Sequence, residues 1–170
     1  MTSSTQRGFS LLEVLIAMTI LSIALLGIAG LQMAATQTDI ESQQKAKLEF
    51  LLEDMVSRLD ANRKNADTYA TGVTNYLGVG NSTQPNSCSG LLGKALDFCE
   101  WNQLLITSGV PQARGCILQT DSTIPKQYMV VVAWHPPVKS TPPANSCANA
   151  AFTAGGQKLL SRTIRIGKLD

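Results

Sequence analysis

The chain has 170 residues and a formal net charge of +2, and only 15% of its residues are charged against 44% hydrophobic ones. This length fits one domain, or one modest domain with an appendage. The weak net charge argues against a dedicated nucleic-acid binder and against a disordered, highly charged tail. Since globular proteins average about 25% charged residues, the apolar residues must be concentrated in one part of the chain.

The apolar residues are concentrated near the N-terminus, where residues 14–38 contain no charged side chain. A helix of about 20 apolar residues spans a bilayer, so this segment is long enough to cross one. A secretory signal has an apolar core of about 7–15 residues followed by a small-residue cleavage site. Because this run is longer and no clean site of that type follows it, we favour a membrane-spanning helix over an ordinary cleaved signal.

One acidic residue, Glu13, lies near the start of this apolar stretch. A carboxylate in the bilayer core costs about 2.5–3.5 kcal/mol on insertion scales, so it needs a partner or a function. The alternative is that Glu13 lies at headgroup depth and reaches the aqueous interface. Physical reasoning alone leaves both interpretations open.

The segment Arg7–Glu13, with the sequence RGFSLLE, resembles the cleavage and methylation motif of type IV prepilins and the related pseudopilins. The resemblance implies that a membrane aspartic peptidase removes the leader between Gly8 and Phe9, and that Phe9 is then N-methylated. It also implies that Glu13 pairs with the N-terminal ammonium of a neighbouring subunit. Breaking a buried ion pair costs about 3–5 kcal/mol, so this pairing would favour assembly.

Two glycines, Gly27 and Gly30, interrupt the apolar stretch. Each costs about 1 kcal/mol relative to alanine in a helix interior. Related filaments unwind their N-terminal helix in this region, so the resemblance makes both glycines candidates for that unwinding. The alternative is close helix packing by small residues, although the spacing is not the Gly-x-x-x-Gly dimer pattern.

Residues 39–64 predict that the helix continues as an amphipathic segment. Its apolar stripe consists of four residues at helical spacing: Leu48, Leu52, Met55 and Leu59. Glu41 with Lys45 and Asp54 with Arg58 form i, i+4 pairs in the favourable order.

No proline interrupts the chain between residues 10 and 61, so one helix is expected over that length. One half would lie in a membrane or a filament core, and the other would pack on a head domain. A coiled coil is the alternative, but the stripe covers less than two heptads, which is too short for that pattern.

The remaining residues predict a small head. Residues 65–84 are rich in Gly, Thr and Asn and predict a loop, whereas residues 91–106 predict a helix. The buried face of that helix is expected to hold Leu92, Leu96, Cys99 and Gln103. Asp97 and Glu100 are expected to face solvent as a solvated pair, with Trp101 beside them.

Three strands are predicted after this helix, at residues 116–120, 127–134 and 160–166. The short connection between the first two favours an antiparallel meander. The connection at 135–158 is long and contains two Pro-Pro pairs, which favours a functional loop or one held by a covalent bond.

All four cysteines lie beyond the apolar stretch, and an even number in an extracytoplasmic domain favours disulfides. Three connectivities are possible. We favour Cys88–Cys99 and Cys116–Cys147, which close a short loop and the long proline-containing loop and would each contribute about 2–4 kcal/mol. The pilin resemblance fits loosely, because a disulfide in that family often brackets the C-terminal variable loop. A zinc site is the alternative, but no Cys-x-x-Cys spacing is present, so no metal site is predicted.

The sequence carries little catalytic chemistry. His135 is its single histidine, and the common nucleophile, metalloprotease and phosphate-loop motifs are absent, so we expect a non-enzyme without cofactors. Arg162, Arg165 and Lys168 lie together on the last strand, where charge would protect a sheet edge. DNA capture is the alternative, but three bases predict only weak, salt-sensitive binding, and nucleic acid is not an expected partner.

A finer resemblance exists to the modification-type, or PilV-type, minor pilins. Four segments carry it: Gly8–Ala17, Leu25–Gln32, Ala95–Leu105 and Gly115–Ile117. The first segment is shared across pilins, and the other three are suggestive only in combination.

These features predict an α+β, pilin-like fold in which a long N-terminal helix packs on a small antiparallel sheet with disulfides. The expected organisation is a leader peptide at residues 1–8, a transmembrane or filament-core helix at 9–38, an amphipathic helix at 39–64 and a globular head at 65–170.

The resemblance implies a minor pilin that helps to initiate type IV pilus assembly or presents its head at the tip. The implied partners are other pilins through the N-terminal helix, the prepilin peptidase and methyltransferase, and the assembly machinery. The chain would cross the bacterial inner membrane once, with its head in the periplasm, before entering the extracellular pilus. One alternative is a minor pseudopilin of a type II secretion system, although no acidic calcium-binding loop is visible near the C-terminus. The other is a membrane-anchored periplasmic domain of unknown binding role.

Overall fold

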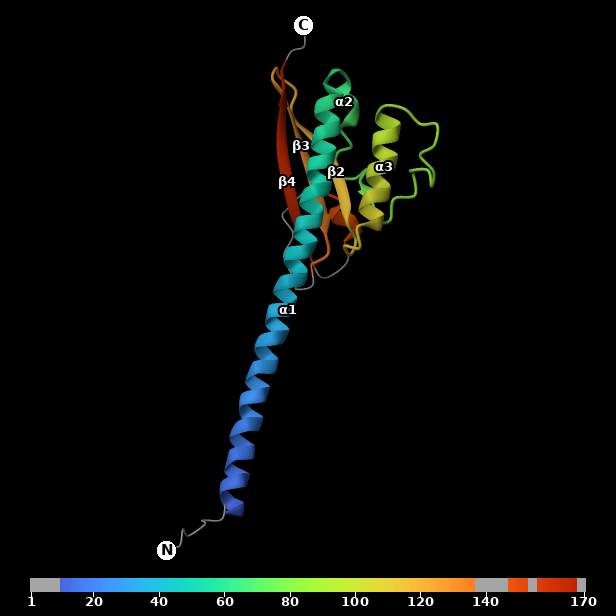
Figure 1. Cartoon of the computed structure of the whole chain (residues 1–170). Helices are drawn as coiled ribbons and strands as arrows, with labels where there is room; N and C mark the ends of the chain where they lie inside the picture. The colour runs from blue at the N-terminus through green and yellow to red at the C-terminus, as the bar shows by residue number, and fades with distance from the viewer. Residues whose placement is uncertain (1–9, 137–146, 153–155, 168–170) are drawn as a thin grey trace, which may run out of the picture. The chain divides into compact units, whose positions relative to one another are not determined.

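The computed structural model describes residues 10–136, 147–152 and 156–167. Its elements in chain order are α1 (Leu11–Ala61), η1 (Arg63–Asn65), α2 (Ala66–Tyr69), β1 (Leu77–Gly78), α3 (Lys94–Thr107), β2 (Arg114–Asp121), β3 (Lys126–Trp134), η2 (Asn149–Ala151) and β4 (Lys158–Ile166) (Figure 1). The chain divides into two compact units, Met1–Ile40 and Glu41–Asp170, and α1 begins in the first and ends in the second. We call residues 11–40 the apolar segment and the second unit the head.

The single long helix and the α+β, pilin-like layout predicted from the sequence are confirmed. The head contains one antiparallel sheet in the order β1-β2-β3-β4. Its central register aligns Cys116 with Val131 and Val131 with Ser161. The three predicted strands are therefore present as a meander, each slightly longer than predicted.

The predicted loop at residues 65–84 is wrong in two places, because it contains α2 and the two-residue strand β1. β1 depends on tertiary contacts, since the Asn102 side chain accepts the buried Gly78 N–H at 2.6 Å. Gly78 has φ +105°, and a Cβ there would lie 2.3 Å from the Ala113 carbonyl oxygen. Only glycine fits this position, and sequence periodicity carries no signal for a strand of this length.

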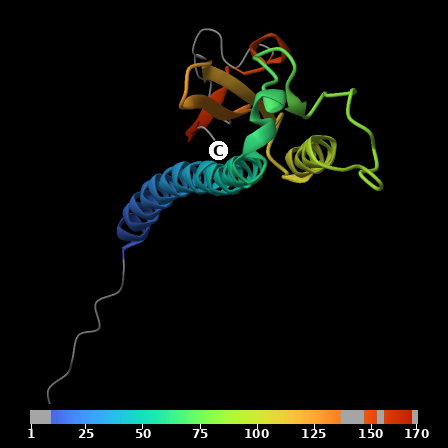
Figure 2. The same ribbon diagram turned by 90° about the horizontal axis from the view of Figure 1, so that it is seen from above.

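The predicted apolar stripe of α1 is confirmed as the centre of the head's core. Leu48, Met55 and Leu59 are fully buried and Leu52 is nearly so. Figures 1 and 2 show the C-terminal part of α1 next to both the sheet and α3. The Trp101 indole N–H donates to the Leu51 carbonyl at 2.8 Å, which ties α3 to α1 inside this core.

The predicted face of α3 needs correction. The helix begins at Lys94, so Leu92 precedes it and is 83% exposed. The buried residues of α3 are Phe98, Cys99, Trp101, Asn102 and Leu105. Gly93 has φ +56° directly before the helix, which sets a start that leucine spacing did not reveal.

Two disulfides join Cys88 to Cys99 and Cys116 to Cys147, the two pairs favoured from the sequence. The first connects the loop after β1 to α3, and the second connects β2 to the segment before η2. Most of the proline-containing loop, residues 137–146, lies outside the described residues.

Of the two ion pairs predicted within α1, one is present and the other is replaced by a pair with β4. Asp54 and Arg58 pair at 2.9 Å, as predicted. Glu41, expected to pair with Lys45, instead forms an ion pair with Lys158 of β4. Tertiary partners therefore compete with pairs that the helical spacing alone allows.

Candidate assembly site on the N-terminal helix

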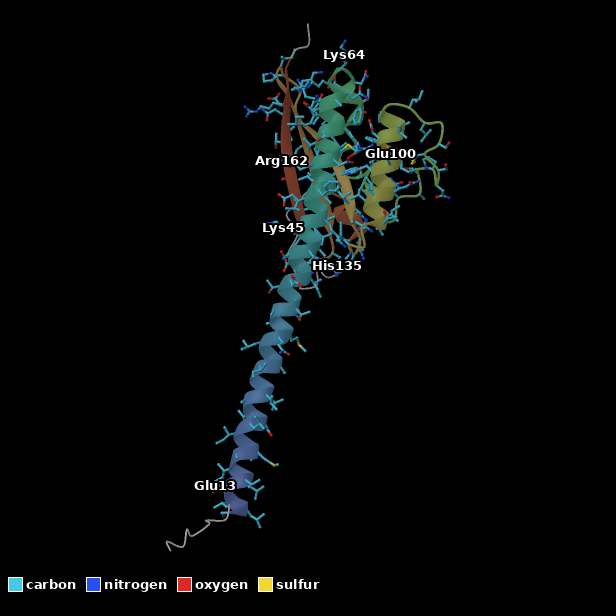
Figure 3. All side chains as sticks on the ribbon, in the orientation of Figure 1. Glu13, Lys45, Lys64, Glu100, His135 and Arg162 are labelled. Carbon is cyan, nitrogen blue, oxygen red and sulfur yellow. A yellow bond between two sulfur atoms is a disulfide. The ribbon has the colours of Figure 1, made fainter. Side chains whose placement is uncertain are left out.

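The first turn of α1 carries the acidic residue that the sequence singled out. The Ser10 carbonyl accepts backbone hydrogen bonds from Glu13 at 3.0 Å and Val14 at 3.3 Å, which starts the helix. Glu13 is exposed in this first turn (Figure 3), where the helix dipole favours a carboxylate. Gly8 and Phe9 lie outside the described residues.

The apolar segment exposes its large side chains in every direction. Its fourteen large apolar residues between positions 11 and 33 are 42% to 86% exposed, from Val14 to Leu11. Among the described residues, α1 is the one helix long and apolar enough to cross a membrane. Since monomeric soluble proteins rarely expose apolar patches above a few hundred Å², this surface requires lipid or other apolar helices.

The hydroxyl groups of the apolar segment are satisfied within the helix itself. Four of them donate to carbonyl groups three or four residues earlier, at 2.7 to 3.1 Å: Thr19, Ser22, Thr36 and Thr38. An unsatisfied polar group in hydrocarbon costs several kcal/mol. These hydroxyls can therefore enter a membrane or a helix bundle without an unsatisfied hydrogen bond. The charged side chain in the first two turns of α1 is Glu13.

Gly27 and Gly30 lie within the continuous helix α1. A Cβ built on either glycine meets no atom within 4 Å. The single chain therefore gives no packing reason for glycine at these positions. Both alternatives from the sequence, local unwinding and close helix approach, place their role in an assembled state.

In the head, the acidic residues of α3 form a structural clasp instead of the expected solvated pair. Arg58 of α1 contacts Asp97 at 3.1 Å and Glu100 at 2.6 Å, in addition to Asp54. Partial burial lowers the pKa of Arg58, but its hydrogen bonds to Glu100, Asp54 and Asp97 outweigh that effect and raise the pKa overall. A permanently charged guanidinium that holds α3 on α1 accounts for these carboxylates without acid–base chemistry.

A cluster of polar side chains around Asp67 was not predicted. The Asp67 carboxylate of α2 accepts hydrogen bonds from Lys126 at 2.5 Å and from the Tyr128 hydroxyl. Both bonds lower the pKa of Asp67, with Lys126 the larger cause. Burial, followed by the bond to Asp67, raises the pKa of Tyr128 to about 12. Sequence spacing could not find this cluster, because its members are about sixty positions apart.

Two of the remaining candidates from the sequence, His135 and Arg162, have structural partners. His135 follows β3, and its Nδ1 lies 3.2 Å from the Gly156 carbonyl oxygen. Arg162 of the edge strand β4 binds Glu53 of α1, whereas Lys168 lies outside the described residues. Within the described part of the chain, no group of three or more His, Cys, Asp or Glu residues is placed to hold a metal ion.

The structure thus defines a disulfide-bonded α+β head on a helix whose N-terminal part can anchor in a membrane. A comparison with family models identifies a prokaryotic N-terminal methylation motif at residues 3–29. The match covers most of the predicted leader, the predicted cleavage position and Glu13, and it is consistent with the type IV pilin family. The motif implies processing by a prepilin peptidase and assembly into pili. No match is found among curated proteins or solved structures.

Proposed function

We propose that this protein is a minor pilin, a non-enzymatic subunit that helps to initiate type IV pilus assembly or presents its head at the tip. One observation carries the proposal. A methylation motif at residues 3–29 leads into a helix whose apolar side chains are exposed in every direction. We choose the pilus over a type II secretion system because of the PilV-type resemblance of residues 25–32, 95–105 and 115–117.

The proposed processing creates the ion pair that drives assembly. Cleavage after Gly8 leaves an α-ammonium on Phe9, which the methyltransferase methylates. Phe9 precedes Glu13 by four residues, or about one helical turn. The pair forms between the ammonium of one subunit and the Glu13 carboxylate of a neighbour, and lipid contacts of the apolar segment are exchanged for contacts with other helices.

The proposed organisation has four parts: a leader at 1–8, a membrane or filament-core helix at 9–38, an amphipathic helix at 39–64 and a globular domain at 65–170, which with the end of that helix forms the head. Before assembly the chain crosses the inner membrane once, with its head in the periplasm. Afterwards it belongs to the extracellular filament. Its partners are other pilins, the peptidase and methyltransferase, and the assembly machinery.

The pairing role is tested by Glu13→Ala, with Glu49→Ala as a matched control because Glu49 is an exposed carboxylate on the same helix. We expect Glu13→Ala to leave leader removal intact and to reduce recovery in sheared filaments at least tenfold. The reason is that loss of one partner of a buried ion pair costs about 3–5 kcal/mol. Quantitative immunoblotting of sheared filaments measures this. Recovery of Glu13→Ala at the level of Glu49→Ala would contradict the pairing.

A further inference from the structure

A polar groove on the head has no role in the proposed assembly. Its volume is about 450 Å³, which lies within the range of about 300–1,000 Å³ typical of ligand pockets. Its walls come from residues 70–71 and 74–77, from residues 80–84 and from Lys94 and Phe98 of α3. Figure 1 shows the loop that follows β1 running beside α3.

Hydrogen bonds fix the shape of this groove in the absence of a ligand. On one wall, the Asn81 side chain donates to the Tyr76 carbonyl at 2.7 Å and accepts the Thr83 backbone N–H at 2.7 Å. Between the two lining segments of the loop, the buried Asn102 side chain accepts the Gly78 N–H, which holds β1 in place. The groove is therefore preformed, which reduces the entropy lost when a ligand binds.

Covalent and aromatic contacts hold the two sides of the groove. The Cys88–Cys99 disulfide connects the loop to α3 at the residue after Phe98. The Tyr76 ring lies 5.2 Å from the guanidinium of Arg114, which fixes one aromatic side chain of the lining. The loop therefore has few ways to collapse into the groove.

Several polar groups of the lining remain available. Four uncharged side chains make no hydrogen bond within the described residues: Thr74, Asn75, Ser82 and Gln84. They offer two hydroxyls and two carboxamides, each of which both donates and accepts hydrogen bonds. The described lining also contains no acidic residue and one basic residue, Lys94, whose ammonium lies 5.1 Å from the centroid of the Phe98 ring.

We propose that this groove binds an oligosaccharide. Sugar hydroxyls both donate and accept hydrogen bonds, so they match hydroxyl and carboxamide side chains. The absence of lining carboxylates also leaves room for acidic sugars beside Lys94. A peptide that binds by strand addition to β1 is disfavoured, because the Asn102 side chain already accepts the Gly78 N–H.

Binding is tested with the full-length protein in lauryldimethylamine oxide micelles, a detergent without a sugar headgroup. The probe is a printed array of bacterial and animal oligosaccharides that also carries polylysine and polyglutamate spots. We expect saturable binding to a sugar, and at least tenfold weaker binding by an Asn75→Ala, Gln84→Ala double variant. Gln119→Ala is the matched control, because it removes an exposed carboxamide that is not part of the groove lining.

A second variant distinguishes the effect of the groove's shape from the effect of direct hydrogen bonds to the sugar. Replacing Cys88 and Cys99 by serine removes the tether of the loop without changing the free polar groups, and we expect it to weaken sugar binding at least tenfold. Binding to no sugar spot, binding to the peptide spots only, or equal binding by the Asn75→Ala, Gln84→Ala variant and Gln119→Ala would each overturn the proposal. Recovery of these variants in filaments is measured separately, so failure here leaves the assembly role standing.

Discussion

The apolar segment and the head use the same kinds of residue in opposite ways. Leu21 and Leu25 of the apolar segment are 60% and 57% exposed, whereas Leu48 and Leu59 on the same helix are fully buried in the head. The head satisfies its own apolar surface and adds two disulfides. Within the apolar segment, only the backbone and hydroxyl groups find partners in the same chain. Its exposed apolar side chains must be covered by lipid or by other helices.

The largest expected effect comes from a matched pair of leucines on α1. Leu59→Ala should lower the free energy of unfolding of the head by about 2–5 kcal/mol, because it leaves a cavity in a fully packed site. Leu21→Ala should leave that free energy unchanged within about 0.5 kcal/mol, because Leu21 has no part in the core. Denaturant titration followed by tryptophan fluorescence measures the head alone, since Trp101 and Trp134 both belong to it. An equal decrease in the free energy of unfolding for both variants would contradict the distinction between the two regions.

Glycine substitutions test the same comparison between the two regions, with smaller expected changes in the free energy of unfolding. A Cβ on Gly115 would lie 2.1 Å from the Trp101 ring, so Gly115→Ala should destabilise the head by about 1–3 kcal/mol through overpacking. A Gly27→Ala, Gly30→Ala double variant should leave head unfolding unchanged and stabilise the helix by about 1 kcal/mol per site. It should nevertheless reduce recovery in sheared filaments if the glycines act in assembly. Normal recovery of that variant would remove both proposed roles for these glycines.

The smallest effect concerns alkaline pH and belongs to the head alone. Burial, followed by the hydrogen bond to Asp97, raises the pKa of Tyr69 to about 12, as burial and Asp67 do for Tyr128. The folded head therefore holds these protons more tightly than the unfolded chain, whose tyrosines have a pKa near 10. The resulting stabilisation is complete below about pH 10 and is lost as pH rises through 12.

The matching measurement is the free energy of unfolding between pH 9 and about 12, compared between the wild type and a Tyr69→Phe, Tyr128→Phe double variant. The double variant should show a shallower loss of stability over this range. An identical slope in both proteins would show that other groups control the alkaline transition.

Much of this fold follows from patterns that are local in sequence. The apolar stretch and the absence of proline predicted α1, helical spacing predicted its buried stripe, and strand-like runs predicted three strands. The start of α3 was missed because it depends on the backbone conformation of Gly93, and β1 was missed because it depends on the side chain of Asn102. Neither leaves a periodic signal in the sequence.

The contacts around the candidate sites also divide into those that local sequence predicts and those that depend on the tertiary fold. Glu13 was identified from a short motif, and its place in the first turn of α1 follows from the local sequence. The partners of Arg58 were only partly predicted, because Asp54 is one turn away while Asp97 and Glu100 belong to another helix. The polar groove brings together a loop and a helix that only the tertiary fold makes adjacent.

The most direct test of the central claim is the intact mass and N-terminal sequence of the protein purified from its native membrane or filaments. Processing as proposed gives a chain that begins at Phe9 and carries one added methyl group on its terminal amine. A polypeptide that still begins at Met1, or one that begins beyond the apolar segment, would contradict the account.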